Sequence, residues 1–410
     1  MNSLSHLPQK SELLKWFEER NQNPYYSVNN HIHTPYSFSA FEDVDQAVRL
    51  AREQNLHVLG INDFFVTDGY EAFAEKCREY NIFPLFNIEF IGLEPEKQQQ
   101  NIRLNDPNNP GRTYFTGKAL KFPAQFDPDD EKKIHSVKQE TQKQVSAMMD
   151  KVNTLLKAIE PGFELSMDEI YEKYAKNLVR ERHIAKLLRI KALEYFKEKD
   201  KIMDFFTRLF DGTSPVSSPD DAAAFENEIR SRLLKAGGKA FVPENENAFL
   251  NVHEIKNIII RAGGIPTYPL LLDDNNGNYT EYESDKEALL TELDKNGVYS
   301  IEFIPQRNDI RHLQEYVSYF YEKGFLVTYG TEHNTPKLTT MIVECRNNKA
   351  LTEELSRTGI NGAAVMAAHQ YLLAKGEEGY IKENGMAKYE MREEFEKLGK
   401  AVIDYYLHQS

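Results

Sequence analysis

An alternation of apolar, strand-like runs with amphipathic helical runs is the feature that most limits the fold of this chain. The helical runs carry apolar residues three to four positions apart, and short polar links join them to the strand-like runs. Strands and helices that alternate in this way are typical of a parallel sheet or a barrel. The expected strands lie at residues 25–33, 57–63, 82–90, 264–272, 298–305 and 325–334.

A long stretch without this alternation separates the third expected strand from the fourth. Residues 94–127 are polar, with one candidate hairpin at 112–122, and residues 128–237 read almost entirely as helices. We therefore predict a discontinuous α/β unit, a mainly helical insertion and a helical C-terminal extension. Their ranges are 1–95 together with 246–348 for the α/β unit, 96–245 for the insertion and 349–410 for the extension.

The charge balance and the cysteine content exclude several classes of protein. The chain has 410 residues, with 50 Lys and Arg against 64 Asp and Glu, so its formal net charge is −14. This charge argues against duplex nucleic acid and an anionic membrane as partners, because both bind basic proteins. Two cysteines are too few for a disulfide framework, and no apolar run is long enough to span a membrane. Since the N-terminus also lacks a signal-peptide pattern, we expect a cytoplasmic protein.

Imidazole and carboxylate side chains follow several of the expected strands. His31 and His33 are two residues apart at the end of the first strand, so their side chains leave the same face and could bind one cation. Glu89 and Glu332 follow apolar strands, where a buried carboxylate needs a partner. These four residues would make a complete ligand set for a divalent transition metal. The alternative is a chance histidine pair in a loop and two carboxylates in solvent.

Two further sets of polar residues allow more than one interpretation. Asp63, after the second strand, could orient a ligand or act as a general base, but it could equally cap the following turn. His183 lies in a helical run of the insertion and reads as a half-exposed helix histidine. Arg180 and Arg182 beside it could contact an anion, although such arginines more often belong to a solvated face.

The ordered set of short motifs resembles that of the PHP (polymerase and histidinol phosphatase) family of metal-dependent phosphoesterases. The resemblance covers residues 30–335 and implies a distorted seven-stranded (β/α) barrel with up to three metal ions. It also implies that His183 is a metal ligand. The matching motifs are His31-Ile32-His33-Thr34, Asn62-Asp63-Phe64, Asn87-Ile88-Glu89, Arg182-His183-Ile184-Ala185, Gly238-Lys239, Ala262-Gly263-Gly264 and Gly330-Thr331-Glu332-His333-Asn334.

Several positions depart from the family pattern. Phe64, Tyr268 and Asn334 stand where the family has histidines, and Glu332 stands in place of an aspartate. The resemblance therefore implies fewer metals than usual, with one or two Mn, Zn or Fe ions.

The leading hypothesis is a metal-dependent hydrolase, a phosphoesterase of a small phosphorylated or nucleotide substrate. Asp63 and Arg182 would be its catalytic residues, and the small anionic substrate would be bound by Tyr268, His333, Asn334 and Arg307. The alternatives are a catalytically inactive binding protein with the same fold, or a hydrolase of a non-phosphate substrate such as a sugar lactone.

Overall fold

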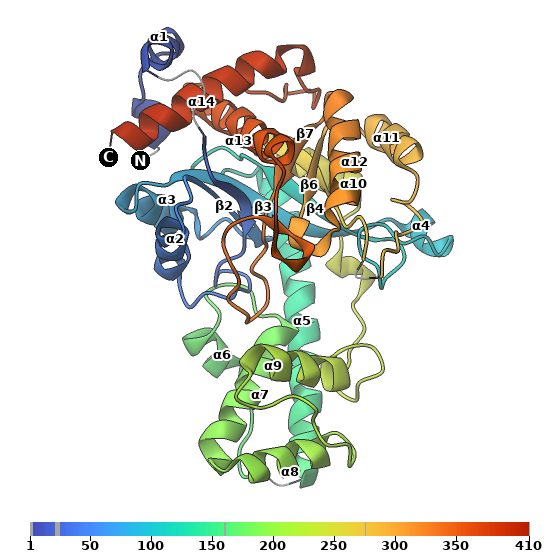
Figure 1. Cartoon of the computed structure of the whole chain (residues 1–410). Coiled ribbons are helices and arrows are strands. Elements are labelled where there is room, and N and C mark those ends of the chain that lie inside the picture. Colours follow the sequence, from blue (N-terminus) through green and yellow to red (C-terminus); the bar gives the residue numbers. More distant parts are fainter. Residues whose placement is uncertain (1–2, 21–24, 160, 275, 410) are drawn as a thin grey trace.

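Seven strands form one sheet that closes into a barrel (Figure 1). The computed structural model describes residues 3–20, 25–159, 161–274 and 276–409. The strands pair in chain order: β1 (Val28–Ile32), β2 (Val58–Phe64), β3 (Phe83–Leu93), β4 (Arg112–Lys118), β5 (Ile265–Leu270), β6 (Ser300–Phe303) and β7 (Leu326–Tyr329). Ile32 pairs with Glu332, just beyond β7, and the backbone N–H of His33 donates to the carbonyl of Glu332 at 2.8 Å. The predicted seven-stranded α/β barrel is confirmed.

Helices surround the barrel and bury their apolar faces against it. They are α2 (Val44–Glu53), α3 (Tyr70–Glu79), α10 (Val252–Arg261), α11 (Lys286–Lys295) and α12 (Ile310–Glu322), with the short α4 (Pro95–Gln99) at the end of β3. Asn251 and Glu254 begin α10 with a capping box, in which each side chain accepts the other residue's backbone N–H. Such a cap fixes the residue at which the helix between two barrel strands begins.

One barrel strand comes from within the range assigned to the insertion. β4 coincides with the candidate hairpin segment, but it pairs antiparallel with β3 on one side and with β5 on the other. The other pairs in the barrel sheet are parallel. A single seven-residue strand between polar segments has no local partner, so its pairing is not visible in the sequence. The boundaries of the insertion stay a prediction.

The helical part of the insertion projects from one end of the barrel (Figure 1, green). Its helices are α5 (Pro128–Ile159), α6 (Met167–Lys173), α7 (Glu181–Phe196), α8 (Lys199–Leu209) and α9 (Ala222–Ile229). They share an apolar core of their own, which includes Val152, Leu187 and Phe206. The insertion is therefore held together by its own packing, and the first turns of α5 lie along α10, as the ion pairs of Lys133 with Glu254 and of Asp130 with Arg261 show.

The C-terminal extension covers the opposite end of the barrel, where the parallel strands begin (Figure 1). It consists of α13 (Glu353–Ala374) and α14 (Arg392–His408), and α1 (Lys10–Arg20) packs on α14. Their apolar side chains cover Val58, Phe83 and Leu326 at the strand starts. A small two-stranded sheet precedes α13 and consists of β8 (Glu344–Cys345) and β9 (Lys349–Ala350). The predicted helical extension is confirmed, and it lies at the end of the barrel opposite the insertion.

Short helical turns complete the described chain: η1 (Ser3–His6), η2 (Arg230–Leu234), η3 (Glu246–Ala248), η4 (Pro305–Arg307), η5 (Arg346–Asn348) and η6 (Tyr389–Met391). Among the described residues, no helix has the length and the apolar character that crossing a membrane requires.

Candidate metal centre

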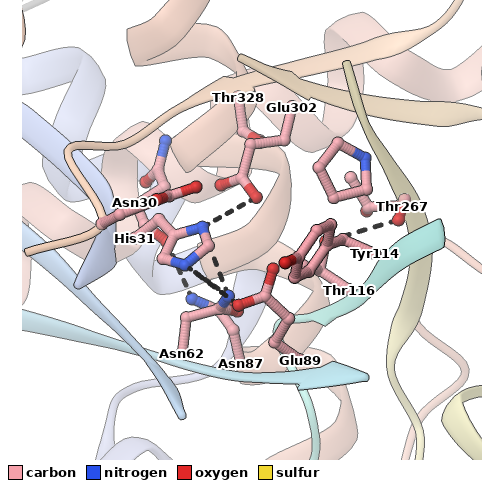
Figure 2. Close-up of polar contacts among 12 residues, drawn as sticks. Asn30, His31, Asn62, Asn87, Glu89, Tyr114, Thr116, Thr267, Glu302 and Thr328 are labelled. Atoms are coloured by element: carbon pink, nitrogen blue, oxygen red, sulfur yellow. Dashed lines mark hydrogen bonds and ion pairs between the residues drawn. The ribbon is translucent and has the colours of Figure 1, made fainter. Parts of the chain in front are cut away.

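Three of the four ligands expected from strand ends meet inside the barrel. The Nε2 atoms of His31 and His33 lie 3.2 Å apart, and an oxygen of Glu89 lies 3.7 Å from the first and 3.1 Å from the second. All three side chains are buried. His31 and Glu89 face each other from β1 and β3 in Figure 2. Two imidazoles and a carboxylate at these distances form a group that could hold one metal ion.

Hydrogen bonds to the far side of each ring direct the Nε2 atoms toward Glu89. Nδ1 of His31 donates to Glu302 at 2.9 Å, and Nδ1 of His33 faces the hydroxyl of Ser37 at 3.4 Å. The amide of Asn62 donates to Nε2 of His31 at 2.8 Å, which requires a lone pair on that atom. Burial lowers the pKa of His33 to about 4, so this ring is neutral near pH 7. A neutral imidazole with a lone pair on Nε2 suits a metal ion, although on His31 this lone pair accepts the Asn62 amide.

Glu89 has no Lys or Arg as a salt-bridge partner in the described part of the chain. Its contacts with ionisable groups are those to His31 and His33. Burial, with a further contribution from the nearby carboxylates of Glu332 and Glu302, raises the pKa of Glu89 to about 8. A carboxylate that is so costly to ionise is strongly stabilised by a cation. The residues present therefore fit a divalent metal.

Sequence reasoning missed the ion pair beneath this group. Lys118 of β4 and Glu302 of β6 have no solvent exposure, and Nζ of Lys118 lies 2.5 Å from Oε1 of Glu302. Burial raises the pKa of Glu302, but Lys118 and His31 outweigh it and bring the pKa to about 2. Glu302 is therefore an anion that fixes the tautomer of His31. The sequence around Lys118 gives no signal for this ion pair, because its partner lies 184 positions away.

The carboxylate of Asp63 ties down the loop that follows β1. One oxygen accepts the backbone N–H of Thr34 at 2.7 Å and the Ser37 hydroxyl at 2.6 Å, and the other accepts the Thr34 hydroxyl at 2.5 Å. Both oxygens thus hold the segment that positions His33. The catalytic role expected for Asp63 stays a prediction, and its contacts are those of a positioning group.

The fourth expected ligand, Glu332, lies beside the group but is bonded elsewhere. Its carboxylate forms a salt bridge with Arg307 and accepts the Asn334 amide at 2.7 Å. Burial raises the pKa of Glu332, while Arg307, His31 and His33 lower it more strongly, so the net shift is downward. The structure therefore brings Glu332, Arg307 and Asn334 together at the edge of the mouth.

Comparison with known proteins finds one similar family. Residues 29–211, a little under half of the chain, match the family model of the PHP domain. No curated protein matches the chain.

Solved structures share this fold at low sequence identity. One is a "putative metal-dependent phosphoesterase" from Bifidobacterium adolescentis ATCC 15703, with 16% identity and a TM-score of 0.50 over 83% of this chain and 98% of that one. Another is an amidohydrolase from Chromobacterium violaceum with bound sulfate and no metal, with 13% identity and a TM-score of 0.50 over 81% and 96% of the two chains. At these identities the likeness establishes the fold.

An aromatic contact fills a position where the PHP motif has a histidine. The ring of Phe64 stacks on His33 with centroids 4.7 Å apart and planes 21° apart, and the guanidinium of Arg180 lies 5.5 Å above Phe64. Phe64 therefore supports His33 by packing. The same contact joins the start of α7 to the mouth of the barrel.

His183 lies at this junction and uses one ring nitrogen to cap α7. Its Nδ1 accepts the backbone N–H of Arg180 at 2.9 Å, so the neutral ring carries its proton on Nε2. Burial lowers the pKa of His183 to about 3. The ring packs edge-on against Phe38, 5.0 Å away, and Arg182 lies 5.2 Å over the same phenyl ring. His183 and Arg182 thus lie at the junction with α7, outside the group formed by His31, His33 and Glu89.

Tyr268 and His333 face other partners. The Tyr268 hydroxyl donates to the buried carboxyl of Glu283 at 3.0 Å. His333 bonds Thr331 at 2.7 Å through Nδ1 and stacks on Phe41, with centroids 5.0 Å apart. Neither side chain belongs to the three-residue group, and the substrate contacts expected for them stay predictions.

Proposed function

We propose that this protein is a metal-dependent hydrolase that acts on a small phosphate ester. The observation that carries the proposal is the buried group of His31, His33 and Glu89, in which two Nε2 atoms lie 3.7 and 3.1 Å from a carboxylate that has no Lys or Arg partner among the described residues. When bound there, a divalent Mn, Zn or Fe ion lowers the pKa of a water molecule and polarises a phosphoryl oxygen. The PHP domain match supports the same reaction class.

The chain's own residues supply position and charge. Glu302 holds the ring of His31, and Asp63 holds the loop that carries His33. Phe64 packs over His33 and limits the access of water from that side. These contacts keep the donor atoms in place before an ion or a substrate arrives, which reduces the reorganisation that the reaction needs.

Arginines at the mouth favour an anionic substrate despite the negative charge of the whole chain. Nη1 of Arg182 is buried and has no hydrogen-bond partner within the described ranges. Burial and the nearby Arg230 lower the pKa of Arg182 to about 10, so an anion beside it would be stabilised. Arg180 lies over Phe64, which stacks on His33, and Arg307 pairs with Glu332 beside the same group. A phosphate group fits this arrangement better than an uncharged ester does.

The test combines metal analysis with a substrate panel. The purified protein is loaded with Mn, Zn or Fe, its metal content is measured, and phosphomonoesters, phosphodiesters, nucleotides and lactones are assayed. The double variant H31A/E89A should lose both metal and hydrolysis. The matched control H253A, at an exposed histidine on α10, should keep both. A double variant that binds as much metal as the parent would contradict the site assignment.

A binding protein without catalysis is the second candidate. The Arg307 salt bridge to Glu332 and the Asn62 amide on His31 occupy two groups that a fuller metal site would use. Metal and phosphate binding without turnover of any substrate in the panel would favour this reading, and turnover of lactones alone would favour a non-phosphate hydrolase.

A further inference from the structure

A buried lysine occupies the interior of the barrel directly beneath the candidate metal centre. Because β4 runs against its neighbours, its last residue, Lys118, pairs with Ile265 at the start of β5. Its side chain enters the barrel from the floor and reaches Glu302 of β6. Nζ lies 2.5 Å from Oε1 of Glu302 and 3.4 Å from Oδ1 of Asn62. The ammonium group thus has a carboxylate and an amide oxygen as neighbours.

These oxygens are the ligand types that hard divalent cations prefer. Glu302 offers Oε1 because its other oxygen is bonded to His31, and Asn62 offers Oδ1 because its amide nitrogen donates to the same ring. Figure 2 shows both side chains directed toward His31 from different strands. Without the lysine, two buried oxygens would face one another with no donor between them. The ammonium therefore lies where a second cation would otherwise be stabilised.

The charges around the site support the same reading. Four carboxylates lie near the two imidazoles: those of Asp63, Glu89 and Glu302 are buried, and that of Glu332 is partly buried. Two cations are paired with them, since Lys118 neutralises Glu302 and Arg307 neutralises Glu332. With both rings neutral as ligands, about two negative charges remain on the barrel side chains, which one divalent ion balances.

We infer that Lys118 takes the place of a second metal ion and limits the centre to one divalent cation, held by His31, His33 and Glu89. The inference rests on the proposed function and names the metal count that the function requires. Lys118 is a positioning residue in this scheme, because it acts through Glu302 and His31.

Metal counting tests the inference without measuring activity. The wild type, K118M and K118R are stripped with a chelator, titrated with Mn²⁺ by calorimetry, and their bound metal is counted after gel filtration. We expect one ion for the wild type and for K118R, which keeps the charge. We expect two ions for K118M, which keeps the length of the side chain and removes the charge. The double variant K118M/E302Q, which also removes the new ligand, should return to one ion.

The outcomes separate the inference from the proposed function. A wild type that binds no ion would overturn the proposed function. A wild type that binds two ions, or a folded K118M that binds one, would overturn only the role of Lys118. If K118M does not fold, anomalous scattering from Mn²⁺-soaked wild-type crystals decides. One peak at His31, His33 and Glu89 supports the inference, and a second peak beside Glu302 overturns it.

Discussion

Metal affinity should fall steeply as the pH drops below 8, because of Glu89. Burial and neighbouring carboxylates raise the pKa of Glu89 to about 8, so at lower pH an ion must displace its proton. Each pH unit below 8 then weakens binding about tenfold, and at pH 6 the loss is about 100-fold, or roughly 3 kcal/mol. His33 adds nothing over this interval, because its pKa is about 4.

Calorimetry in buffers of different ionisation enthalpy measures this proton directly. We expect release of about one proton per Mn²⁺ ion at pH 6 and almost none at pH 9. E89Q should bind weakly, with an affinity that does not change between pH 6 and 8. E283Q is the matched control, because burial also raises the pKa of Glu283 to about 8, yet its carboxyl contacts Tyr268 and not the metal group. An affinity of the wild type that is equal at pH 6 and 8 would refute the reasoning.

Three further variants test the packing around the site. In G330A, the added Cβ would lie 2.1 Å from Cβ of His31. We therefore expect the free energy of unfolding in urea to fall by about 1–3 kcal/mol and metal binding to weaken. Unchanged metal binding would contradict this prediction. F64A removes the ring stacked on His33 and should cost about 3–5 kcal/mol, measured by the same unfolding assay. D63N leaves at least one donor of the β1 loop unpaired and should cost about 1–3 kcal/mol; if it keeps full kcat, Asp63 is not the general base.

The parts of the fold that local patterns encode could be predicted from the sequence. Six barrel strands lie between amphipathic helices, and the spacing of His31 and His33 follows from the two-residue repeat of a strand. Glu89 is recognisable because a carboxylate directly after an apolar run needs a partner. These features depend on neighbours within a few positions.

The missing parts depend on contacts between distant residues. β4 has no pairing partner nearby in the chain, and the role of Lys118 depends on its ion pair with Glu302, which lies on another strand. The hydrogen bond from the Arg180 backbone to His183 assigns that ring a tautomer that no spacing predicts. Arg307 likewise reaches Glu332 only because the strands close into a barrel.

The helices that cover the barrel floor follow all seven barrel strands in the chain. Every side chain of the candidate metal centre therefore leaves the ribosome before α13 and α14 do, so the apolar strand starts at Val58, Phe83 and Leu326 stay uncovered until these two helices have been synthesised. A nascent chain that stalls before residue 349 would expose this apolar surface to chaperones and proteases. Since α1 packs on α14, as the ion pair of Glu18 with Lys397 at 2.6 Å illustrates, α1 cannot reach its final position before α14 has been made.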